Sequence, residues 1–255
     1  MSNQIIKEQF NKQAVKFANW SVSKNVEYLN AYFEFCGIRN EDSLLDVACG
    51  PGEFTIFIAK RIRKAKGVDI SDKEVEIGNN LAKEFGLNNI SFDCHDVEHL
   101  PYEDNSFSVV LCKSALHHFT KPEKVFKEMV RCCKKGGLIS LQDIMAYDDY
   151  YVNDFFETFE KYVDVSHNRT LSENEINNLY NDLDIQKTGE YKVTVDLNMR
   201  EYLEHAVQNE ESKIKIKELL ERGLNDSRLK DYIFIKSNEL YFKRHVFLIK
   251  GTKSH

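Results

Sequence analysis

The stretch LLDVACGPGEFT, Leu44–Thr55, decides the fold. A short apolar run contains an acid near its end, Cys-Gly-Pro-Gly follows, and Phe54, Ile58 and Ile62 then recur at helical spacing. This order predicts a strand buried on both faces, a tight turn and a helix. The turn could be structural, could bind a phosphate, or could serve another cofactor.

Strand and helix patterns alternate through residues 44–144. After the first strand, short apolar runs predict strands at 65–70, 90–95, 107–113 and 138–144. Helical stripes lie between several of these runs. The alternation predicts a doubly wound α/β fold, with a mostly parallel sheet and helices on both of its faces.

Side chains at the predicted helix ends fit known capping patterns. A Ser or Thr stands three residues before Glu at three helix starts, the capping-box spacing, in the pairs Ser71 and Glu74, Thr120 and Glu123, and Ser172 and Glu175. Gly86 predicts the end of the first helix, and Gly136-Gly137 the end of the second.

The segments on either side of this core do not show its regular alternation of strand and helix patterns. The N-terminal residues predict helices, and Phe10, Phe17 and Trp20 form an aromatic stripe that could pack in the core or cover the strand ends as a lid. After the core, helical patterns surround strands at 191–197 and 241–252. Seven aromatic residues in this region could line a substrate pocket or pack the insertion: Tyr147, Tyr150, Tyr151, Phe155, Phe156, Phe159 and Tyr162.

Composition limits the classes of partner. The 255 residues carry a formal charge of -6, with a pI of about 5.8, which disfavours nucleic-acid binding because phosphates need a basic surface. No window approaches the ~18 apolar residues of a membrane span, and no signal peptide is visible. Six cysteines without a Cys-x-x-Cys pair indicate reduced thiols in a cytoplasmic protein.

The glycine loop does not match the usual phosphate-binding motifs. Thr55 stands where a dinucleotide fingerprint needs its third small residue, and the Gly-Lys-Ser/Thr of a Walker loop is absent. Asp46 and Glu53 flank the loop and would repel phosphate. Two such carboxylates favour a ligand with cationic groups, such as an ammonium or a sulfonium.

Taken together, these motifs resemble class I S-adenosylmethionine-dependent methyltransferases, in the ubiquinone/menaquinone-biosynthesis-type branch. LLDVACGPGEFT resembles the first motif of that family, and GVDIS places Asp69 at the acid of the second strand. CHDVEHLPYEDNSFSVVLCKSALHHF and VRCCKKGGLISLQD resemble its later motifs, so the likeness covers residues 40–145. The resemblance implies a seven-stranded Rossmann-like sheet, ordered 3-2-1-4-5-7-6 with the last strand antiparallel.

The same resemblance divides the chain into four parts. We expect an N-terminal helical lid at 1–40 and a cofactor-binding Rossmann-like core at 41–145. A helical region at 146–230, with a strand near 191–197, would cover the substrate, and a C-terminal strand at 231–255 would complete the sheet.

The resemblance also assigns S-adenosyl-L-methionine as cofactor and indicates its contacts. Asp69 would bind the ribose hydroxyls, Asp96 the adenine amino group, and Val97 would line the adenine site. Because Ser71 already caps the following helix, the Asp69 carboxylate is expected to be available for a cis-diol. The remaining expected cofactor-binding residues are Asp46, Ala48, Gly50, Gly52, Ile70 and Lys113.

Two adjacent histidines are the catalytic candidates. His117 and His118 follow the strand at 107–113, where a substrate would meet the cofactor. Adjacent side chains diverge in most backbone conformations, so one is expected to face the substrate while the other packs. Either could be a general base, or could orient the substrate. No third ligand is evident that would make them a metal site.

The sequence therefore predicts a methyltransferase acting on an O, N or C nucleophile of a small molecule. One alternative is an enzyme of this fold that binds S-adenosylmethionine but catalyses a different reaction. Another is a non-catalytic regulatory protein that keeps the cofactor pocket. We expect no nucleic-acid partner and no membrane span, and leave a homodimer open.

Overall fold

One sheet runs through the molecule. Within residues 2–21, 24–183 and 185–254, which this computed structural model describes, it has eight strands in the order β3-β2-β1-β4-β5-β8-β6, with β7 paired to β8. The strands are β1 Ser43–Val47, β2 Lys64–Asp69, β3 Ile90–Cys94, β4 Phe107–Lys113, β5 Cys133–Ile144, β6 Ile185–Asn198, β7 Ile233–Lys236 and β8 Glu239–Lys253. The helices are α1 Asn3–Ala18, α2 Val26–Cys36, α3 Glu53–Ala59, α4 Asp72–Glu84, the 3-10 turn η2 Leu116–His118, α5 Pro122–Cys132, α6 Tyr150–Val163, α7 Glu173–Asn181, α8 Met199–Glu204 and α9 Glu210–Asn225.

The predicted strand order is confirmed, with one strand added. β6 and β8 occupy the places of the sixth and seventh strands, and β8 runs antiparallel to both β5 and β6. The sequence pattern did not predict β7, a short strand that pairs antiparallel with the start of β8. β7 and β8 meet at Ser237 and Asn238, which both have positive φ, as tight hairpin turns require.

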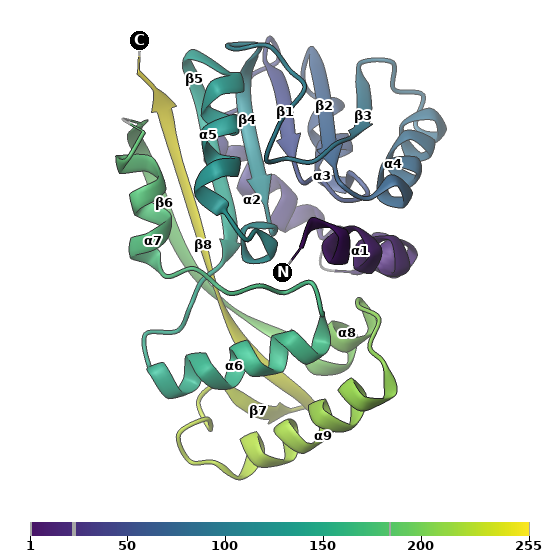
Figure 1. Cartoon of the computed structure of the whole chain (residues 1–255), viewed down its shortest axis with the longest axis vertical. Helices are drawn as coiled ribbons and strands as arrows, with labels where there is room; N and C mark the ends of the chain where they lie inside the picture. Colours follow the sequence, from purple (N-terminus) through teal and green to yellow (C-terminus); the bar gives the residue numbers. More distant parts are fainter. Residues whose placement is uncertain (1, 22–23, 184, 255) are drawn as a thin grey trace.

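The first strand is buried on both faces, as its apolar run predicted. All five residues of β1 are buried, and alternate side chains enter different clusters. Leu44 packs with residues of α2 and α3, whereas Leu45 and Val47 pack with residues of α5 and α7. The two clusters place helices on opposite faces of the sheet, as Figure 1 shows.

The capping predictions were partly correct. Ser172 and Glu175 form a complete capping box, and Gly86, at φ +64°, follows the end of α4. The box predicted at Thr120 was wrong, because α5 begins at Pro122 after Lys121 and has no side-chain cap. The predicted end at Gly136-Gly137 was also wrong: α5 ends at Cys132, and both glycines lie in β5. A Cβ on Gly137 would lie 2.9 Å from the Ser108 carbonyl oxygen, so this glycine allows close strand pairing.

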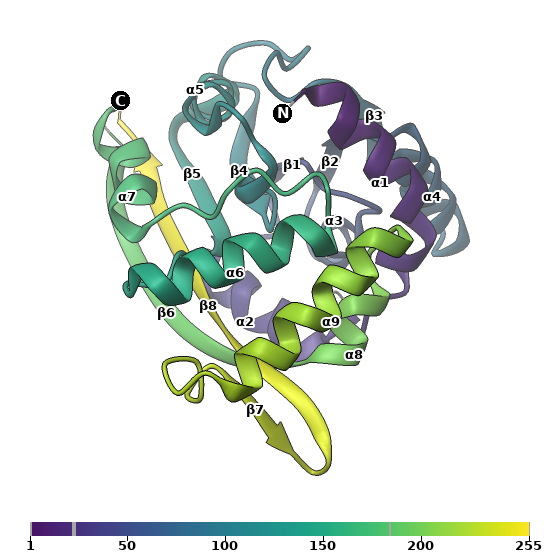
Figure 2. The same ribbon diagram turned by 60° about the horizontal axis from the view of Figure 1, so that its bottom comes forward.

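A second lobe lies beyond the end of the sheet. Figures 1 and 2 show α6, α8 and α9 gathered around β7 and the first half of β8. Phe155, Phe156 and Phe159 of α6 are almost fully buried there, beside Phe242 of β8. These side chains therefore pack the lobe itself. Helix α6 turns its apolar stripe toward α9 and β8, because that is where the lobe forms its own core.

Helix α1 lies across the carboxyl ends of the parallel strands, between the sheet and the second lobe (Figure 1). Lys7 pairs with Asp72 at the start of α4, at 3.0 Å. On the other side, Gln13 donates to the Asp164 carboxylate at 2.8 Å. The helix therefore bridges the two lobes over the region where a ligand of this fold would bind. No described helix is long and apolar enough to cross a membrane.

Candidate functional site

The glycine loop turns sharply between β1 and α3. Ala48, Gly50 and Gly52 all have positive φ, at +54°, +57° and +82°. A side chain at Gly52 would collide with Phe92, because its Cβ would lie 2.3 Å from that ring. These turns bring the backbone of Gly50 to the mouth of a cavity, while Gly52 packs behind the loop.

The carboxylate of Asp69 ties this loop to the next strand end. Its Oδ2 accepts from the Gly50 backbone N–H and its Oδ1 from the Ser71 backbone N–H, both at 2.9 Å. Ser71 does cap α4, since its hydroxyl accepts from the Glu74 N–H. Asp69 also helps to orient the helix entry, through its bond from the Ser71 N–H. Each of its oxygens keeps a second lone pair for a ligand.

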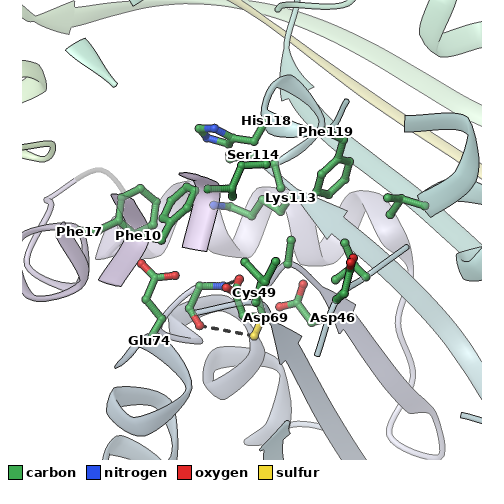
Figure 3. A pocket seen from close by; sticks show the side chains of 18 of the residues that line it. Phe10, Phe17, Asp46, Cys49, Asp69, Glu74, Lys113, Ser114, His118 and Phe119 are labelled. Carbon is green, nitrogen blue, oxygen red and sulfur yellow. Dashed lines mark hydrogen bonds between the residues drawn. The ribbon is translucent and has the colours of Figure 1, made fainter. Parts of the chain in front are cut away.

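We call the cavity at these strand ends the acidic cavity. Six acidic side chains line this cavity. Figure 3 shows three of them, Asp46, Asp69 and Glu74, on one side, opposite Phe10, Phe17 and His118. Its lining residues are Asn3, Ile6, Phe10, Phe17, Asp46, Ala48, Cys49, Gly50, Glu53, Phe54, Asp69, Ile70, Glu74, Asp96, Val97, Glu98, Lys113, Ser114, Ala115, His118, Phe119 and Val125.

The acids of this cavity have open acceptor atoms. Within the described part of the chain, Oδ1 of Asp46, Oε1 of Glu53 and both carboxylate oxygens of Glu74 are buried without a hydrogen-bond partner. Burial raises the pKa of Asp46 to about 6, although the hydrogen bond from Thr55 lowers it in part. Burial also raises the pKa of Glu53 to about 7. Such groups suit a ligand that brings hydrogen-bond donors and positive charge.

A half-buried cation, Lys113, faces these acids. Lys113 lines the acidic cavity at the end of β4. Burial lowers the pKa of its ammonium group, and the charges of Asp46, Glu53 and Asp143 oppose that effect. The site can therefore hold a ligand that carries both a cationic group and a carboxylate.

Asp96 and Val97 lie at the other end of the cavity, after β3. The Asp96 carboxylate accepts from the Asn3 side-chain amide at 2.7 Å and from the Glu98 N–H at 2.9 Å. Asn3 belongs to α1, so this helix also closes that end of the cavity.

A second space, the aromatic cavity, adjoins the first. Its volume is about 660 Å³, and it lies between α1, α2 and the strands β6 and β8. It shares five residues with the acidic cavity: Phe10, Phe17, Lys113, Ser114 and His118. Other aromatic side chains on its walls are Trp20, Tyr28, Tyr32, Phe35, Tyr191 and Tyr202.

The aromatic cavity is not lined by any of the seven aromatic residues between Tyr147 and Tyr162, which the sequence had offered as one possible source of a substrate pocket. Most of them pack the second lobe, and α1, α2 and β6 provide the aromatic walls instead. Helices before the core, rather than those after it, therefore supply most of the aromatic surface of this cavity.

The two histidines converge, contrary to the expectation that they would diverge. Their ring centroids lie 4.1 Å apart, and both line the aromatic cavity. The short η2 turn lets successive side chains share one side. His117 Nδ1 lies 2.6 Å from Asp143 Oδ1, whereas His118 Nδ1 lies 3.0 Å from the Ser166 carbonyl oxygen. Both contacts require a proton on Nδ1, which leaves each Nε2 as an acceptor when the ring is neutral.

The two histidines differ in their electrostatic surroundings. Burial, with help from the neighbouring His117, lowers the pKa of His118 to about 3, so this ring is neutral near pH 7. Burial would raise the pKa of Asp143, but His117 and the Leu116 N–H outweigh it and hold this pKa below its usual range. His117 therefore faces an ionised partner.

The predicted site residues come together with one exception. Eight of the nine expected cofactor-binding residues line the acidic cavity, and Gly52 lies outside that lining. Asp143 was not predicted as a site residue, although it lies next to the last residue of β5, where parallel strands present ligands. Glu74 was predicted only as a capping residue. Among the described residues, no group of three or more His, Cys, Asp or Glu side chains is placed to hold a metal ion.

Fold and site together define a doubly wound α/β protein with a cofactor cavity at the ends of β1, β2 and β4. The family model described as "Methyltransferase domain" matches residues 38–222. The chain therefore belongs to the methyltransferase-domain family, as its motifs predicted, and S-adenosylmethionine is the cofactor of that family.

Curated relatives carry the same family name. The uncharacterized methyltransferase YcgJ of Bacillus subtilis is 30% identical over 163 residues, which are 64% of this chain and 64% of YcgJ. The demethylmenaquinone methyltransferase of Staphylococcus aureus is 30% identical over 145 residues, which are 51% of this chain and 59% of that protein. The matched segments thus span less than the full length of these relatives.

Solved structures share the fold over most of the chain. The YcgJ crystal structure has a TM-score of 0.82 at 24% identity, and covers 90% of this chain and 99% of its own. A putative methyltransferase from Bacillus halodurans has a TM-score of 0.81 at 20% identity, covering 90% of this chain and 100% of its own.

Proposed function

We propose that this protein is an S-adenosylmethionine-dependent methyltransferase that methylates an O, N or C nucleophile of a small molecule. The observation that carries the proposal is the pair of adjoining cavities. One presents buried carboxylate oxygens without partners around a glycine loop, and the other is a larger aromatic space. The five residues common to both mark the place where cofactor and substrate would meet.

The residues of the acidic cavity fit each part of the cofactor. Asp69 is oriented by hydrogen bonds from the backbone N–H groups of Gly50 and Ser71. Its carboxylate would accept hydrogen bonds from the ribose hydroxyls. Asp96 would bind the adenine amino group, beside Val97. At the other end, Lys113 would pair with the carboxylate of the amino-acid part.

The other expected cofactor contacts also stay predictions, and most of their residues line the same cavity. Asp46 and Glu53 offer acceptors to the ammonium group of the cofactor. Ala48, Gly50 and Ile70 line the acidic cavity in which the cofactor would lie. For Gly52 we propose a supporting role, because it shapes the loop without lining the cavity.

The cofactor supplies an activated methyl group when bound. The protein then needs mainly to hold the nucleophile in line and to exclude water. Phe10 and Phe17 of α1 cover both cavities, which supports the proposal that α1 is a lid.

We assign the role of general base to His117. A base works best with a pKa near the operating pH, and the low pKa of His118 makes that ring a poor proton acceptor. Asp143 holds the Nδ1 proton of His117, which leaves Nε2 to take a proton from the nucleophile. We propose that His118 instead orients the substrate beside Phe10, whose ring lies 4.9 Å from its own.

The small-molecule assignment rests on the enclosed aromatic space and on the relatives. Among these are an ajmaline N-methyltransferase of Rauvolfia serpentina, 37% identical over 99 residues, and the demethylmenaquinone enzyme. The names of these two relatives refer to small molecules. A cytoplasmic location and the absence of a nucleic-acid partner stay predictions, and a homodimer stays open.

Transfer of a labelled methyl group tests the proposal. Cell extract would be incubated with the protein and methyl-labelled S-adenosylmethionine, and its metabolites profiled. We expect label in a small molecule and an equal yield of S-adenosylhomocysteine. Label found only in protein or RNA would contradict the substrate class. Cofactor binding without S-adenosylhomocysteine formation, across varied extracts, would instead favour a regulatory protein or a different reaction.

A further inference from the structure

The side chain of Glu74 is placed unlike any other acid of the site. It belongs to the first turn of α4, is fully buried, and faces the acidic cavity. Neither of its carboxylate oxygens has a hydrogen-bond partner among the described residues. A buried polar group with no partner is costly, so its retention at a ligand cavity needs a reason.

The local helix start does not provide that reason. A Glu at this position normally reaches back to the backbone N–H of the capping residue. Here the Ser71 N–H donates to Asp69 instead, so Glu74 has lost its usual partner. Its Oε2 lies beside Gly50, 3.4 Å from where a Cβ on that residue would be. Figure 3 shows the carboxylate pointing toward Phe17 and Phe10 of α1.

The charged groups that act most strongly on Glu74 are all acids. The titratable groups that face it are Asp69 of β2, Glu53 of α3, Asp164 after α6, and Cys49 of the loop. Helix α1 presents an apolar ring at this point. Burial first, and then the three acids, raise the pKa of Glu74 well above its usual value. In the ligand-free protein these surroundings therefore favour the neutral, protonated form of the group.

We propose that Glu74 is a second ribose-binding carboxyl group, which gives up its proton to solvent when the cofactor enters, so that cofactor binding is coupled to proton release. The inference rests on the proposed cofactor site. Asp69 already accepts two backbone bonds, whereas both Glu74 oxygens beside it are open. Hydroxyl donors on those oxygens favour the ionised form. Binding therefore strengthens as pH rises through the range in which free Glu74 is protonated.

Calorimetry with S-adenosylhomocysteine tests this coupling without turnover. This ligand keeps the ribose but has no sulfonium charge, so any proton released reports on the hydroxyl contacts. Titrations at pH 8 in two buffers of different ionisation enthalpy give the number of protons released. At that pH, Glu53, with a pKa of about 7, is already mostly ionised. Wild-type protein, Glu74→Gln and the matched control Glu76→Gln, an exposed residue of the same helix outside the cavity, would be compared.

We expect wild-type protein and Glu76→Gln to release a proton fraction that Glu74→Gln does not release. Wild-type affinity should rise with pH, by up to about tenfold per unit, and Glu74→Gln should flatten that rise. Binding to wild-type protein without proton release, or equal release by Glu74→Gln, overturns this inference alone. Failure of the ligand to bind wild-type protein overturns the proposed cofactor site as well. Proton release by wild-type protein at pH 8, where Asp46 and Glu53 are already mostly ionised, decides the matter even if Glu74→Gln does not fold.

Discussion

His117 and Asp143 form a close pair at the ends of β4 and β5, with 2.6 Å between Nδ1 and Oδ1. The aspartate is almost fully buried and also accepts the Leu116 N–H, so its position is fixed. The pair thereby fixes the His117 ring and its tautomer at the wall of the aromatic cavity.

Loss of His117 should reduce turnover without weakening cofactor binding. We expect His117→Ala to lower kcat by about 10²–10⁴-fold, the usual contribution of general-base catalysis. Asp143→Asn should lower it too, because an amide does not hold the same tautomer as firmly. Neither side chain lines the acidic cavity, so affinity for S-adenosylhomocysteine should not change.

Methyl-transfer rates and calorimetry on the same samples would check this. His99→Gln is the control, because His99 is exposed and lines neither cavity. Full activity of His117→Ala would show that the histidine only packs or orients the substrate.

Asp69→Ala should weaken cofactor binding by about 1.5–3 kcal/mol, the scale of hydrogen bonds to a charged group. Some stability should also be lost, since the carboxylate accepts two backbone N–H groups. Calorimetry and urea unfolding separate the two effects. The matched control is Asp93→Ala, at the end of β3, whose carboxylate pairs with Lys66 outside the cavity. An unchanged affinity in Asp69→Ala would mean that Asp69 has only a structural role.

Glu74→Gln should change the pH dependence of stability. The folded-state pKa of Glu74 lies above its unfolded value, so its contribution is complete below that unfolded value, and is lost as pH rises through the folded pKa. Glutamine does not titrate. At pH 8 the variant should be more stable than wild-type protein by about 1–3 kcal/mol, because the wild-type protein must either ionise a buried carboxyl group or keep it protonated against the solvent pH.

Urea unfolding at pH 4.5 and pH 8 measures this difference. The control, Glu76→Gln, changes an exposed residue of the same helix and should stay within about 0.5 kcal/mol of wild-type protein at both pH values. A Glu74→Gln variant less stable than wild-type protein at pH 8 would show that the carboxylate is satisfied in solution.

The fluorescence of Trp20 should report on α1. It is the only tryptophan in the sequence, it lies just after α1, and it stacks on His205 at 4.6 Å. Phe17, 6.0 Å from Trp20, lines both cavities. We expect S-adenosylhomocysteine to shift the Trp20 emission, because a lid adjusts when its cavity fills. An unchanged spectrum at saturating ligand would assign the aromatic stripe to ordinary packing.

The sequence predicted most of the fold because local patterns and tertiary burial agree there. Every residue of β1 is buried, as its apolar run predicted, and Ser172 caps its helix as the spacing indicated. The prediction failed where tertiary pairing overrode the local signal. Gly136 and Gly137 resembled a helix stop, but they lie within β5, between residues 133 and 138 that pair with β4.

Site residues could be predicted where a family-like motif lies at the end of a predicted strand, as it does for Asp69 and Asp96. Glu74 and Asp143 could not be assigned in the same way. The spacing of Glu74 fits a capping box, and only the structure shows that Asp69 takes its partner. Asp143 becomes informative once His117 is found beside it, a contact between residues 26 positions apart.

The most direct test of the central claim is a calorimetric titration of the purified protein with S-adenosylhomocysteine, and separately with NAD. Both ligands carry adenosine, but NAD places a pyrophosphate where the acidic cavity presents Asp46 and Glu53. The account predicts binding of S-adenosylhomocysteine in the micromolar range and no binding of NAD. Tight binding of NAD with no binding of S-adenosylhomocysteine would contradict it.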